Sequence, residues 1–589
     1  MGSNTPAWGV LCLMQSDMPV AGLRTSAWET GTPRHFCAWN PPRLSRVTGL
    51  DSTMAKSETA ASVQAEKPAL RNERAEVHKA IWKIADDLRG KVTGWNFMIY
   101  VLGTIFYRFI SEKIENHMNG YQRKAGRTDF IYGDIPDEKA DRARKTITDM
   151  LGYYIPPSQL FRNVREKERD NPDLNIFLGD ALTAIEESAK GTETERDFKG
   201  LFAGLDFNNS QILGDTVPER NKYIVKILDG IASMDLGGFS EHSIDVFGDA
   251  YEFLMTMYAS NAGKSGGEFF TPQQVSRLLA LIATRGKKKI ANVYDPACGS
   301  GSLLMQVAKV IGKDNVTDGF YGQETEPTTH RLCRMNLFLH GISPHKFDIH
   351  KGDTLLAPSE FQKSRKPFEV AVSNPPYGTK WDGDSNPLLV SDERFAPAGA
   401  LAPKKAADYA FIMHVLSWLA PNGTAAIVCF PGIFYRGGAE QRIRKYLVDN
   451  NYVDAVIDLA SNLFFGNSIA VTIFVLRKNK TNDNTVLFVN GKDQFIKTGK
   501  NKNLLTEENI GNLFRLYCDR KDVPYRAKVV PCDTIAANEY NLSVPTYVEA
   551  EPPPPPKPIE ELNAEIDGMV ERQNAARAKI KELIMEISS

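Results

Sequence analysis

The stretch Val370-Ala371-Val372-Ser373-Asn374-Pro375-Pro376-Tyr377 is an apolar run that ends abruptly in Asn-Pro-Pro-Tyr. Such a run predicts a buried strand of a parallel sheet, and the ligand-binding residues of these sheets follow the carboxyl ends of the strands. Two consecutive prolines, Pro375 and Pro376, lack N–H donors and fix φ, so the strand must stop and the loop is stiff. We therefore expect Asn374 and Tyr377 to be held rigidly at the edge of the sheet.

This loop suits methyl transfer to an exocyclic amine, whose lone pair is delocalised into an aromatic ring and is a poor nucleophile. The side-chain oxygen of Asn374 and the carbonyl of Pro375 can each accept one N–H of that amine, which favours the tetrahedral nitrogen of the transition state. Tyr377 is expected to stack on the base, which contributes about 1–3 kcal/mol. Considered alone, Asn-Pro-Pro-Tyr is equally compatible with a simple turn.

A second motif lies upstream, where a predicted strand over 290–294 runs into Asp295-Pro296-Ala297-Cys298-Gly299-Ser300-Gly301 and then into a helical segment. Small residues let the backbone approach a ligand at the N-terminus of a helix. The next predicted strand, over 320–324, ends in Glu324, where a carboxylate can accept hydrogen bonds from ribose hydroxyls. A Gly-x-Gly alone is weak evidence, but this one lies in a strand–turn–helix unit followed by an acidic strand end.

In this order, Asp-Pro-Ala-Cys-Gly-Ser-Gly, Gly322-Gln323-Glu324, Gly352-Asp353 and Asn-Pro-Pro-Tyr resemble the motifs of amino-group DNA methyltransferases. With Gly266-Gly267-Glu268-Phe269-Phe270-Thr271-Pro272 just upstream, the chain resembles more narrowly the modification subunit of type I restriction–modification systems. The resemblance runs from about Ala75 to the C-terminus. It implies S-adenosylmethionine as the cofactor and N6 of a flipped-out adenine in DNA as the methylated atom.

The motifs and the resemblance together define candidate site residues. The candidate catalytic residues are Asn374, Pro375, Pro376 and Tyr377. The candidate cofactor-binding residues are Glu268, Phe270, Thr271, Pro272, Gln273, Asp295, Pro296, Gly299, Ser300, Gly301, Glu324 and Asp353. We expect direct transfer of the methyl group, with no metal and no covalent enzyme intermediate.

Three of these assignments have a structural alternative. By resemblance, Glu268 to Gln273 lie across the methionine end of the cofactor, although Thr271-Pro272 is also a sound helix start. Asp353 follows a strand end and can accept the amine of the cofactor adenine, or it can cap the turn that begins at Thr354. Asp295 can also be a cap, but its position before the glycine loop favours the ligand.

Composition bounds the class of protein. A chain of 589 residues predicts two or three domains, and its formal net charge is −1. Proteins that grip DNA alone are usually basic because phosphate contacts dominate affinity, so we expect a partner to supply much of the DNA contact. The seven cysteines form neither a zinc pattern nor a disulfide framework. No secretory or membrane-spanning run occurs in the sequence, which predicts a cytoplasmic protein.

The N-terminal part divides into three predicted segments. Residues 1–53 hold three of the seven tryptophans among prolines and glycines, with no helical or strand period. A polar leader over 54–72 begins at Met54, so we predict that Met54 is the native start and that 1–53 is a non-native or dispensable extension. A targeting segment is the alternative, but the expected patterning is missing. An intact-mass measurement on protein from the native locus would overturn the prediction if the mass matched a chain that begins at Met1.

Apolar residues recur at helical spacing over 73–240, as in Ile81 and Ile84, which predicts an all-helical N-terminal domain. Such a domain can be a purely structural bundle. The resemblance adds that it helps to embrace DNA and partner subunits.

Strands and helices alternate over 245–495, which predicts a doubly wound α/β methyltransferase domain. The seven expected strands lie near 290–294, 320–324, 347–350, 370–373, 425–430, 453–459 and 471–476. By resemblance, the last of them inserts antiparallel. A long polar segment over 378–405 is expected to close over the flipped base. Within it Trp381 either stacks there or anchors the loop, and beyond it Arg436 is a candidate phosphate contact.

The pattern weakens over 496–550, which we predict to be helical or irregular, and 551–558 is a stiff proline-rich spacer. After it, apolar residues at three- and four-residue steps predict a coiled-coil helix over 559–589. That seam comprises Ile559, Leu562, Ile566, Met569, Gln573, Ala576, Ile580, Leu583 and Ile587. A solitary helix would expose it, so we expect a partner: the specificity subunit, by resemblance, or this chain's own bundle. The resemblance also implies a second copy of this chain, a restriction subunit and double-stranded DNA as partners.

We therefore predict a site-specific adenine-N6 DNA methyltransferase that acts as the modification subunit of a type I complex. One alternative is a stand-alone amino-group methyltransferase acting on cytosine N4 or a protein glutamine, because the Asn-Pro-Pro-Tyr loop also suits those amines. The glutamine enzymes are typically smaller and lack the helical domain and the coiled-coil tail. A catalytically silent scaffold is the other alternative, but its expected signature is loss of Asn374 or the glycine loop, and both are intact.

Overall fold

The structure is a computed structural model. It describes residues 77–84, 86, 94–234, 243–261, 271–358, 367–464, 468–480, 484–499, 502–552 and 557–588. The predicted segments 1–53 and 54–72, and the predicted cofactor residues Glu268 and Phe270, lie outside the described residues.

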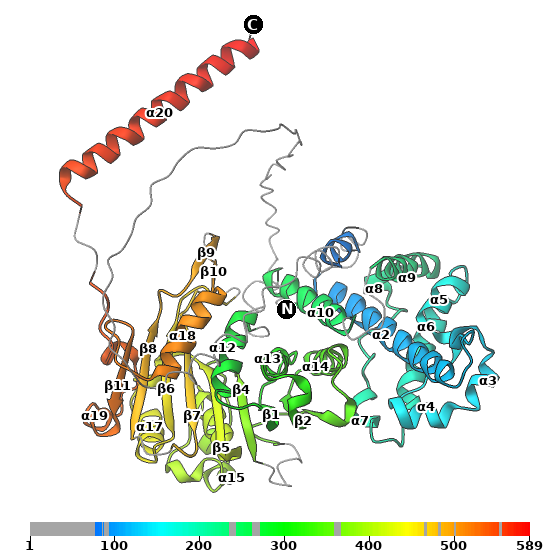
Figure 1. The fold of residues 1–589 in the computed structure, drawn as a ribbon, viewed down its shortest axis with the longest axis horizontal. Coiled ribbons are helices and arrows are strands. Elements are labelled where there is room, and N and C mark those ends of the chain that lie inside the picture. The colour runs from blue at the N-terminus through cyan, green and yellow to red at the C-terminus, as the bar shows by residue number, and fades with distance from the viewer. Residues whose placement is uncertain are drawn as a thin grey trace, which may run out of the picture. The chain divides into compact units, whose positions relative to one another are not determined.

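The first region, up to residue 234, is helical, as predicted (Figure 1). A helical segment over 77–84 begins it. The helices that follow are α2 (Gly94–Lys124), α3 (Asp137–Asp141), α4 (Arg144–Leu151), α5 (Phe161–Lys167), α6 (Leu174–Ser188), α7 (Glu195–Phe198), α8 (Ser210–Leu213) and α9 (Val217–Ala232). The long helix α2 buries Tyr100, Ile105 and Phe109, which follow the predicted spacing. Helix α9 begins with a capping box, because the side chains of Thr216 and Glu219 each accept a backbone N–H of the other residue.

The second region is built on one sheet, which has nine strands among the described residues. Their order is β11-β8-β6-β7-β5-β4-β1-β2-β3. The bounds are β1 Ile290–Asp295, β2 Val316–Glu324, β3 Phe347–Lys351, β4 Phe368–Ser373, β5 Leu419–Cys429, β6 Val453–Leu459, β7 Thr472–Arg477, β8 Thr485–Gly491 and β11 Ala527–Pro531. The seven predicted strands are β1 to β7, and β7 lies antiparallel between β5 and β6, as expected.

The sheet is wider than predicted and continues beyond residue 495. Strand β8 pairs in parallel with β6, and β11 pairs with β8 in antiparallel register, with Ala527 opposite Val489. The segment predicted as helical or irregular therefore contributes an edge strand to this sheet, and it also forms β9 (Ile496–Gly499) with β10 (Lys502–Leu504). The pattern missed β11 because it is a five-residue edge strand that ends in proline, with two exposed positions.

Helices cover both faces of the sheet, the doubly wound arrangement that was predicted. Val370 and Val372 of β4 belong to one buried cluster, and Ala371 between them belongs to another, because successive side chains of a strand point to opposite faces. The first cluster includes α12 (Gln273–Ala283), α13 (Ser302–Ile311), α14 (Pro327–Leu339) and α18 (Glu507–Asp519). The second includes α16 (Asp408–Trp418), α17 (Ala439–Asp449) and α19 (Cys532–Ala537).

The helical region and the sheet share one hydrophobic core. Phe106 of α2 packs against Phe338 of α14, with ring centroids 5.7 Å apart, and α10 (Ser243–Asn261) contributes Phe247 to the same cluster. The buried guanidinium of Arg334 on α14 donates through Nη1 to the carbonyls of Arg196, Asp197 and Lys199, each at 3.0 Å. Residues far apart in the chain are thus joined by apolar packing and by hydrogen bonds.

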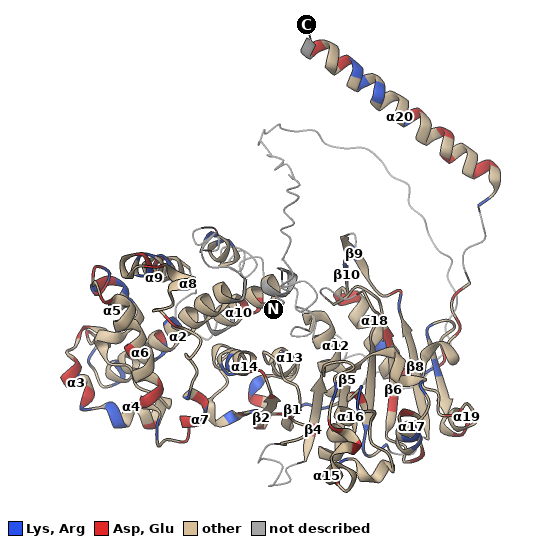
Figure 2. Ribbon diagram, turned by 180° about the vertical axis from the view of Figure 1, so that it is seen from behind, with Lys and Arg blue, Asp and Glu red and all other residues tan. Residues whose placement is uncertain are grey.

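The predicted C-terminal helix is α20 (Ile559–Ser588). Its apolar seam is exposed; Ile566, for example, is 51% exposed and Ile580 is 55% exposed. Acidic residues gather in the first half of α20, basic residues follow them, and Glu582 and Glu586 lie near its C-terminal end (Figure 2). No helix in the described part of the chain is long and apolar enough to cross a membrane.

Candidate functional site

A cavity of about 310 Å³ opens where the carboxyl ends of β1, β2, β3 and β4 meet; we call it the central cavity. Its walls combine the glycine loop after β1, the acidic end of β2, the turn after β3 and the Asn-Pro-Pro-Tyr loop after β4. It is lined by Thr271, Asp295, Pro296, Ala297, Cys298, Gly299, Ser300, Ser302, Leu303, Gln323, Glu324, Thr325, Glu326, Asp353, Thr354, Leu355, Asn374, Pro376, Thr379, Lys380, Trp381 and Phe411. Parallel sheets bind ligands at this edge.

The glycine loop has a backbone that only glycine tolerates well. Gly299 and Gly301 have φ values of 54° and 80°, in the left-handed region. A Cβ added to Gly301 would lie 2.8 Å from Sγ of Cys333 on α14, so a side chain there would clash. The loop is thereby held close to α14, and its outer surface faces the central cavity.

Two carboxylates organise the loops around the cavity. Glu324 accepts the N–H of Gly299 and the N–H of Glu326, both at 2.9 Å. Asp353 accepts the N–H of Leu355 at 2.8 Å through Oδ1. Asp353 therefore caps its own turn and also lines the cavity, so its two predicted roles are compatible.

Asp295 is completely buried and only half satisfied. Its Oδ1 accepts the N–H of Ala297 at 3.0 Å and the hydroxyl of Ser373 at 2.9 Å. Its Oδ2 has no hydrogen-bond partner among the described residues. Burial raises the pKa of this carboxyl to about 7, and the neighbouring charge of Glu324 acts in the same direction. A buried acceptor left without a donor is costly, so this oxygen is prepared to receive a ligand.

Two hydrogen bonds hold the Asn374 amide directly after the carboxyl end of β4. Its Nδ2 donates to Oγ1 of Thr271 at 3.0 Å, and its Oδ1 accepts the hydroxyl of Tyr377. The N–H of Gly378, directly after the motif, donates to Oδ2 of Asp408 at the start of α16, at 3.2 Å. The loop is thus fixed from both sides, and the amide is oriented before any substrate arrives.

The central cavity brings together most of the described candidate residues. Those that line it are Thr271, Asp295, Pro296, Gly299, Ser300, Glu324, Asp353, Asn374 and Pro376. Pro272, Gln273, Gly301, Pro375 and Tyr377 are not among the lining residues. Gln273, at the first position of α12, points to α10 instead, where its Nε2 donates to Oε2 of Glu252 at 2.6 Å.

Several lining residues carried no sequence motif. Thr379, Lys380 and Trp381 come from the long segment after the Asn-Pro-Pro-Tyr loop, and Phe411 comes from α16. The indole N–H of Trp381 donates to the carbonyl of Pro403 at 3.1 Å, and the ring meets that of Phe395 edge-on. These contacts favour the anchoring role of Trp381. Phe411 gave no signal because α16 is buried from Asp408 to Leu416, so its apolar pattern does not single out one face.

The described residues contain no group of three or more His, Cys, Asp or Glu side chains placed to hold a metal ion. The polar groups that line the central cavity include carboxylates, the Asn374 amide, several hydroxyls and Lys380.

Comparisons with known proteins cover nearly the whole described chain. The N-6 DNA Methylase family model matches residues 242–553, and the HsdM N-terminal domain model matches residues 77–231. The type I restriction enzyme MpnII methylase subunit of Mycoplasma pneumoniae is 46% identical over 530 residues, which cover 87% of this chain and 97% of that protein. The MjaIX methylase subunit of Methanocaldococcus jannaschii is 26% identical over 551 residues, covering 86% and 91%.

The fold also matches a solved structure. The type I restriction-modification system methyltransferase subunit from Streptococcus thermophilus superposes with a TM-score of 0.72 at 32% identity, covering 81% of this chain and 100% of that one.

Proposed function

Because the chain belongs to the N-6 DNA methylase family, we propose that it transfers a methyl group from S-adenosylmethionine to N6 of an adenine in DNA, as the modification subunit of a type I restriction–modification complex. The observation that carries the proposal is the central cavity, which joins the glycine loop, Glu324 and Asp353 to Asn374 in one space. Methyl transfer needs cofactor and target to meet at one point, and Asn374 lines the same cavity as the proposed cofactor-binding residues.

The cavity residues fit S-adenosylmethionine, which when bound supplies an electrophilic methyl group on a sulfonium. Glu324 accepts hydrogen bonds from the ribose hydroxyls, and Asp353 accepts one from the adenine amine. The glycine loop allows close backbone approach. The unpartnered Oδ2 of Asp295 receives a donor or a positive charge of the ligand, which relieves its buried state.

Asn374 and the carbonyl of Pro375 bind the target amine. Each accepts one N–H, which draws the nitrogen toward the tetrahedral geometry of the transition state. To reach them the adenine must leave the duplex, at a cost of a few kcal/mol of unstacking. Tyr377 stacks on the base once its hydroxyl has left Asn374. Its ring lies in the rigid loop, so little further ordering is needed.

The partners follow from charge and exposure. A chain of net charge −1 has little intrinsic attraction for DNA phosphates, so a specificity subunit supplies much of the contact with double-stranded DNA. The exposed seam of α20, together with the helical region, binds that subunit. A second copy of this chain and a restriction subunit complete the complex, which works in the cytoplasm.

The test is transfer of labelled methyl from S-adenosylmethionine to DNA, with and without the specificity subunit encoded beside this chain. We expect label on adenine N6 only with that partner, and loss of more than about 100-fold in Asn374→Ala. Asn422→Ala is the matched control, because Asn422 lies outside the cavity lining and its side-chain amide donates to Oε1 of Glu369.

Other outcomes favour the alternatives. Label on DNA without the partner would indicate a stand-alone methyltransferase, and label on cytosine N4 would change the target base. Label on protein, with none on DNA, would indicate a glutamine methyltransferase. No transfer to either, with partner binding intact, would leave only a scaffold role.

A further inference from the structure

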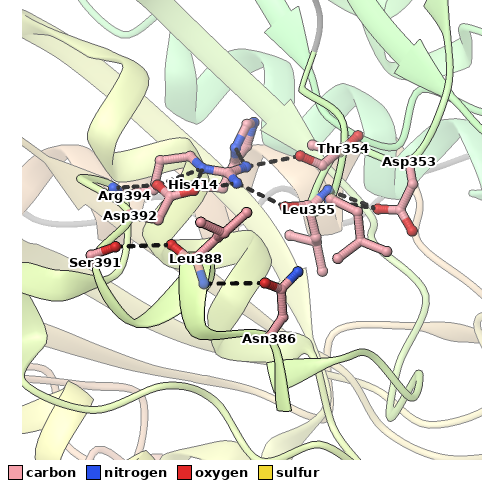
Figure 3. Close-up of polar contacts among 10 residues, drawn as sticks. Asp353, Thr354, Leu355, Asn386, Leu388, Ser391, Asp392, Arg394 and His414 are labelled. Atoms are coloured by element: carbon pink, nitrogen blue, oxygen red, sulfur yellow. Dashed lines mark hydrogen bonds and ion pairs between the residues drawn. The ribbon is translucent and has the colours of Figure 1, made fainter. Parts of the chain in front are cut away.

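Arg394 lies in the long segment that follows the Asn-Pro-Pro-Tyr loop, yet its side chain is only 7% exposed. It follows the short helix α15 (Pro387–Val390), whose turn is closed by Asn386 and Ser391 (Figure 3). A charged side chain is rarely buried without partners, because desolvation of the charge is costly. Its contacts therefore show what the burial achieves.

All five N–H groups of the Arg394 guanidinium have an acceptor. Nη1 donates to the carbonyl of Thr354 at 2.9 Å and to Nδ1 of His414 at 3.1 Å. Nη2 donates to the carbonyl of Leu355 at 2.7 Å and to Oδ2 of Asp392 at 2.7 Å, and Nε contacts the same carboxylate. Figure 3 shows the guanidinium between Asp392, His414 and the Thr354–Leu355 backbone.

The two carbonyls belong to the turn that carries Asp353. Oδ1 of Asp353 accepts the N–H of Leu355, so the carboxylate and the Arg394 contacts lie on the same few peptide groups. The hydroxyl of Thr354 donates to the carbonyl of Pro296 in the glycine loop. Arg394 thereby holds the cofactor side of the central cavity through its backbone.

The other contacts reach the target side. Phe395, the next residue, meets the ring of Trp381 with centroids 5.5 Å apart, and Trp381 and Asn374 both line the cavity. His414 lies on α16, whose first residue, Asp408, holds the N–H of Gly378. Since Nδ1 of His414 accepts from Arg394, its Nε2 carries the hydrogen and donates to the hydroxyl of Tyr294, beside Asp295, at 2.8 Å.

We propose that Arg394 is a positioning residue that joins the turn carrying Asp353 to the 378–405 segment, so that the cofactor and target walls of the cavity are ordered together. The inference rests on the proposed function and adds a coupling between its two binding events. Binding of the cofactor at Asp353 stabilises the turn, and the guanidinium transmits that order to the segment that lines the target side. The planar fork of arginine suits this task, because one group grips two carbonyls, a carboxylate and an imidazole.

The test compares two buried arginines in the full-length chain. Arg394→Lys keeps the charge but cannot reproduce the fork. Arg444→Lys is the matched control, because Arg444 is 1% exposed and also donates to two carbonyls. Those carbonyls belong to Ile433 and Tyr540, which do not line the central cavity, whereas Thr354 and Leu355 do. We expect both variants to lower the unfolding midpoint. Only Arg394→Lys is expected to raise the dissociation constant for S-adenosylmethionine, by roughly tenfold or more.

Hydrogen exchange measures the coupling itself. In the wild type, S-adenosylmethionine is expected to slow amide exchange throughout 378–405, and in Arg394→Lys at saturating ligand this protection is expected to disappear while protection of the glycine loop remains. Equal effects of the two arginine variants on affinity, or unchanged protection of 378–405, would overturn the inference. If the wild type failed to bind S-adenosylmethionine, that result would contradict the proposed cofactor, and the inference that rests on it would be withdrawn as well.

Should Arg394→Lys fail to fold, Asp392→Asn replaces it. That change keeps the guanidinium and removes only the charge of its most exposed partner. We expect a rise of about threefold in the same dissociation constant and partial loss of protection over 378–405, and no change in either quantity would count against the inference.

Discussion

The hydroxyl of Tyr377 donates a hydrogen bond to Oδ1 of Asn374, the same atom that the proposed mechanism needs for the target amine. The nitrogen of the same amide, Nδ2, donates to Oγ1 of Thr271. The catalytic side chain is thus satisfied within the protein before the target arrives, so binding of the adenine exchanges one hydrogen bond for another. This exchange avoids a buried, unpaired amide oxygen in the resting enzyme.

Removing only the hydroxyl should therefore leave catalysis intact. In Tyr377→Phe the ring still stacks on the base, and Oδ1 of Asn374 is free for the amine, so we expect kcat within about threefold of wild type. Tyr377→Ala loses the stack, worth about 1–3 kcal/mol, and should lower kcat/KM by roughly 5- to 150-fold. Steady-state methylation of DNA measures both. A Tyr377→Phe variant as impaired as Tyr377→Ala would show that the hydroxyl itself is needed.

The Thr271 hydroxyl orients the amide so that its oxygen faces the target. Thr271→Val keeps the shape but removes the acceptor for Nδ2 of Asn374, so we expect kcat to fall roughly tenfold, in line with one lost hydrogen bond to a positioned group. Thr271→Ser keeps the acceptor and should retain most of kcat. Single-turnover methylation at saturating cofactor and DNA distinguishes the two variants. Equal activity of valine and serine variants would remove Thr271 from the orientation of Asn374.

Asp295 predicts a pH dependence of cofactor affinity. Its pKa of about 7, raised by burial, means that the carboxyl is neutral below pH 7 and ionised above it. S-adenosylmethionine carries positive charge on its sulfonium and ammonium groups, so its dissociation constant should fall by about three- to tenfold between pH 6 and pH 8. In Asp295→Asn the affinity should be weaker and flat over that range. Calorimetric titration at several pH values is the measurement, and a slope that persists in Asp295→Asn would assign the effect to another group.

The carboxyl of Asp295 also predicts how the free energy of unfolding of the ligand-free protein changes with pH. The folded-state pKa lies above the ordinary value, so the folded protein keeps a proton that the unfolded chain loses. The free energy of unfolding should therefore decrease as pH rises from about 4 to 7, and Asp295→Asn should remove this part of the decrease. Urea unfolding of the two proteins at matched pH values measures the difference.

Substitutions in the α20 seam are expected to weaken association with the partner subunit without lowering the stability of this chain. Its apolar residues are exposed, so Ile566→Glu should leave the unfolding midpoint within about 1 °C while weakening association with the specificity subunit at least tenfold. Ala578→Glu, which adds the same charge outside the seam, is the control and should bind normally. Co-purification followed by sedimentation measures association. A lowered midpoint in Ile566→Glu would show that the seam packs on the chain itself.

The parts of the fold that periodicity and motifs could predict are those defined by local pattern. Strands such as β1, β4 and β6 are largely apolar runs, β3 alternates apolar and polar residues, and the glycine loop follows β1 directly. Strand β11 was missed because it is short, ends in Pro531 and has two exposed positions, so that only its pairing with β8 identifies it as part of the sheet. Arg394 was missed for a related reason: two of its acceptors are backbone carbonyls, which every residue possesses.

Side-chain direction was the other limit. Gln273 follows the motif by position, but the first turn of α12 turns it toward Glu252, which also contacts Lys309 and lies beside His340. Burial alone would raise the pKa of Glu252, but these partners lower it to about 2, so this carboxylate stays charged and attracts the amide. A long-range charge of this kind leaves no trace in the local sequence.

The hydrophobic core shared by α2 and α14 has a consequence for how the protein unfolds. Phe106 and Phe338 are buried in one continuous cluster that also includes strand residues of the sheet. Truncating either phenylalanine would leave a cavity that weakens packing in the helical region and in the sheet region, because both regions contribute atoms around it. The helical region and the sheet should therefore unfold in one calorimetric transition. A chain whose N-terminal helices misfold should consequently have no active methyltransferase region.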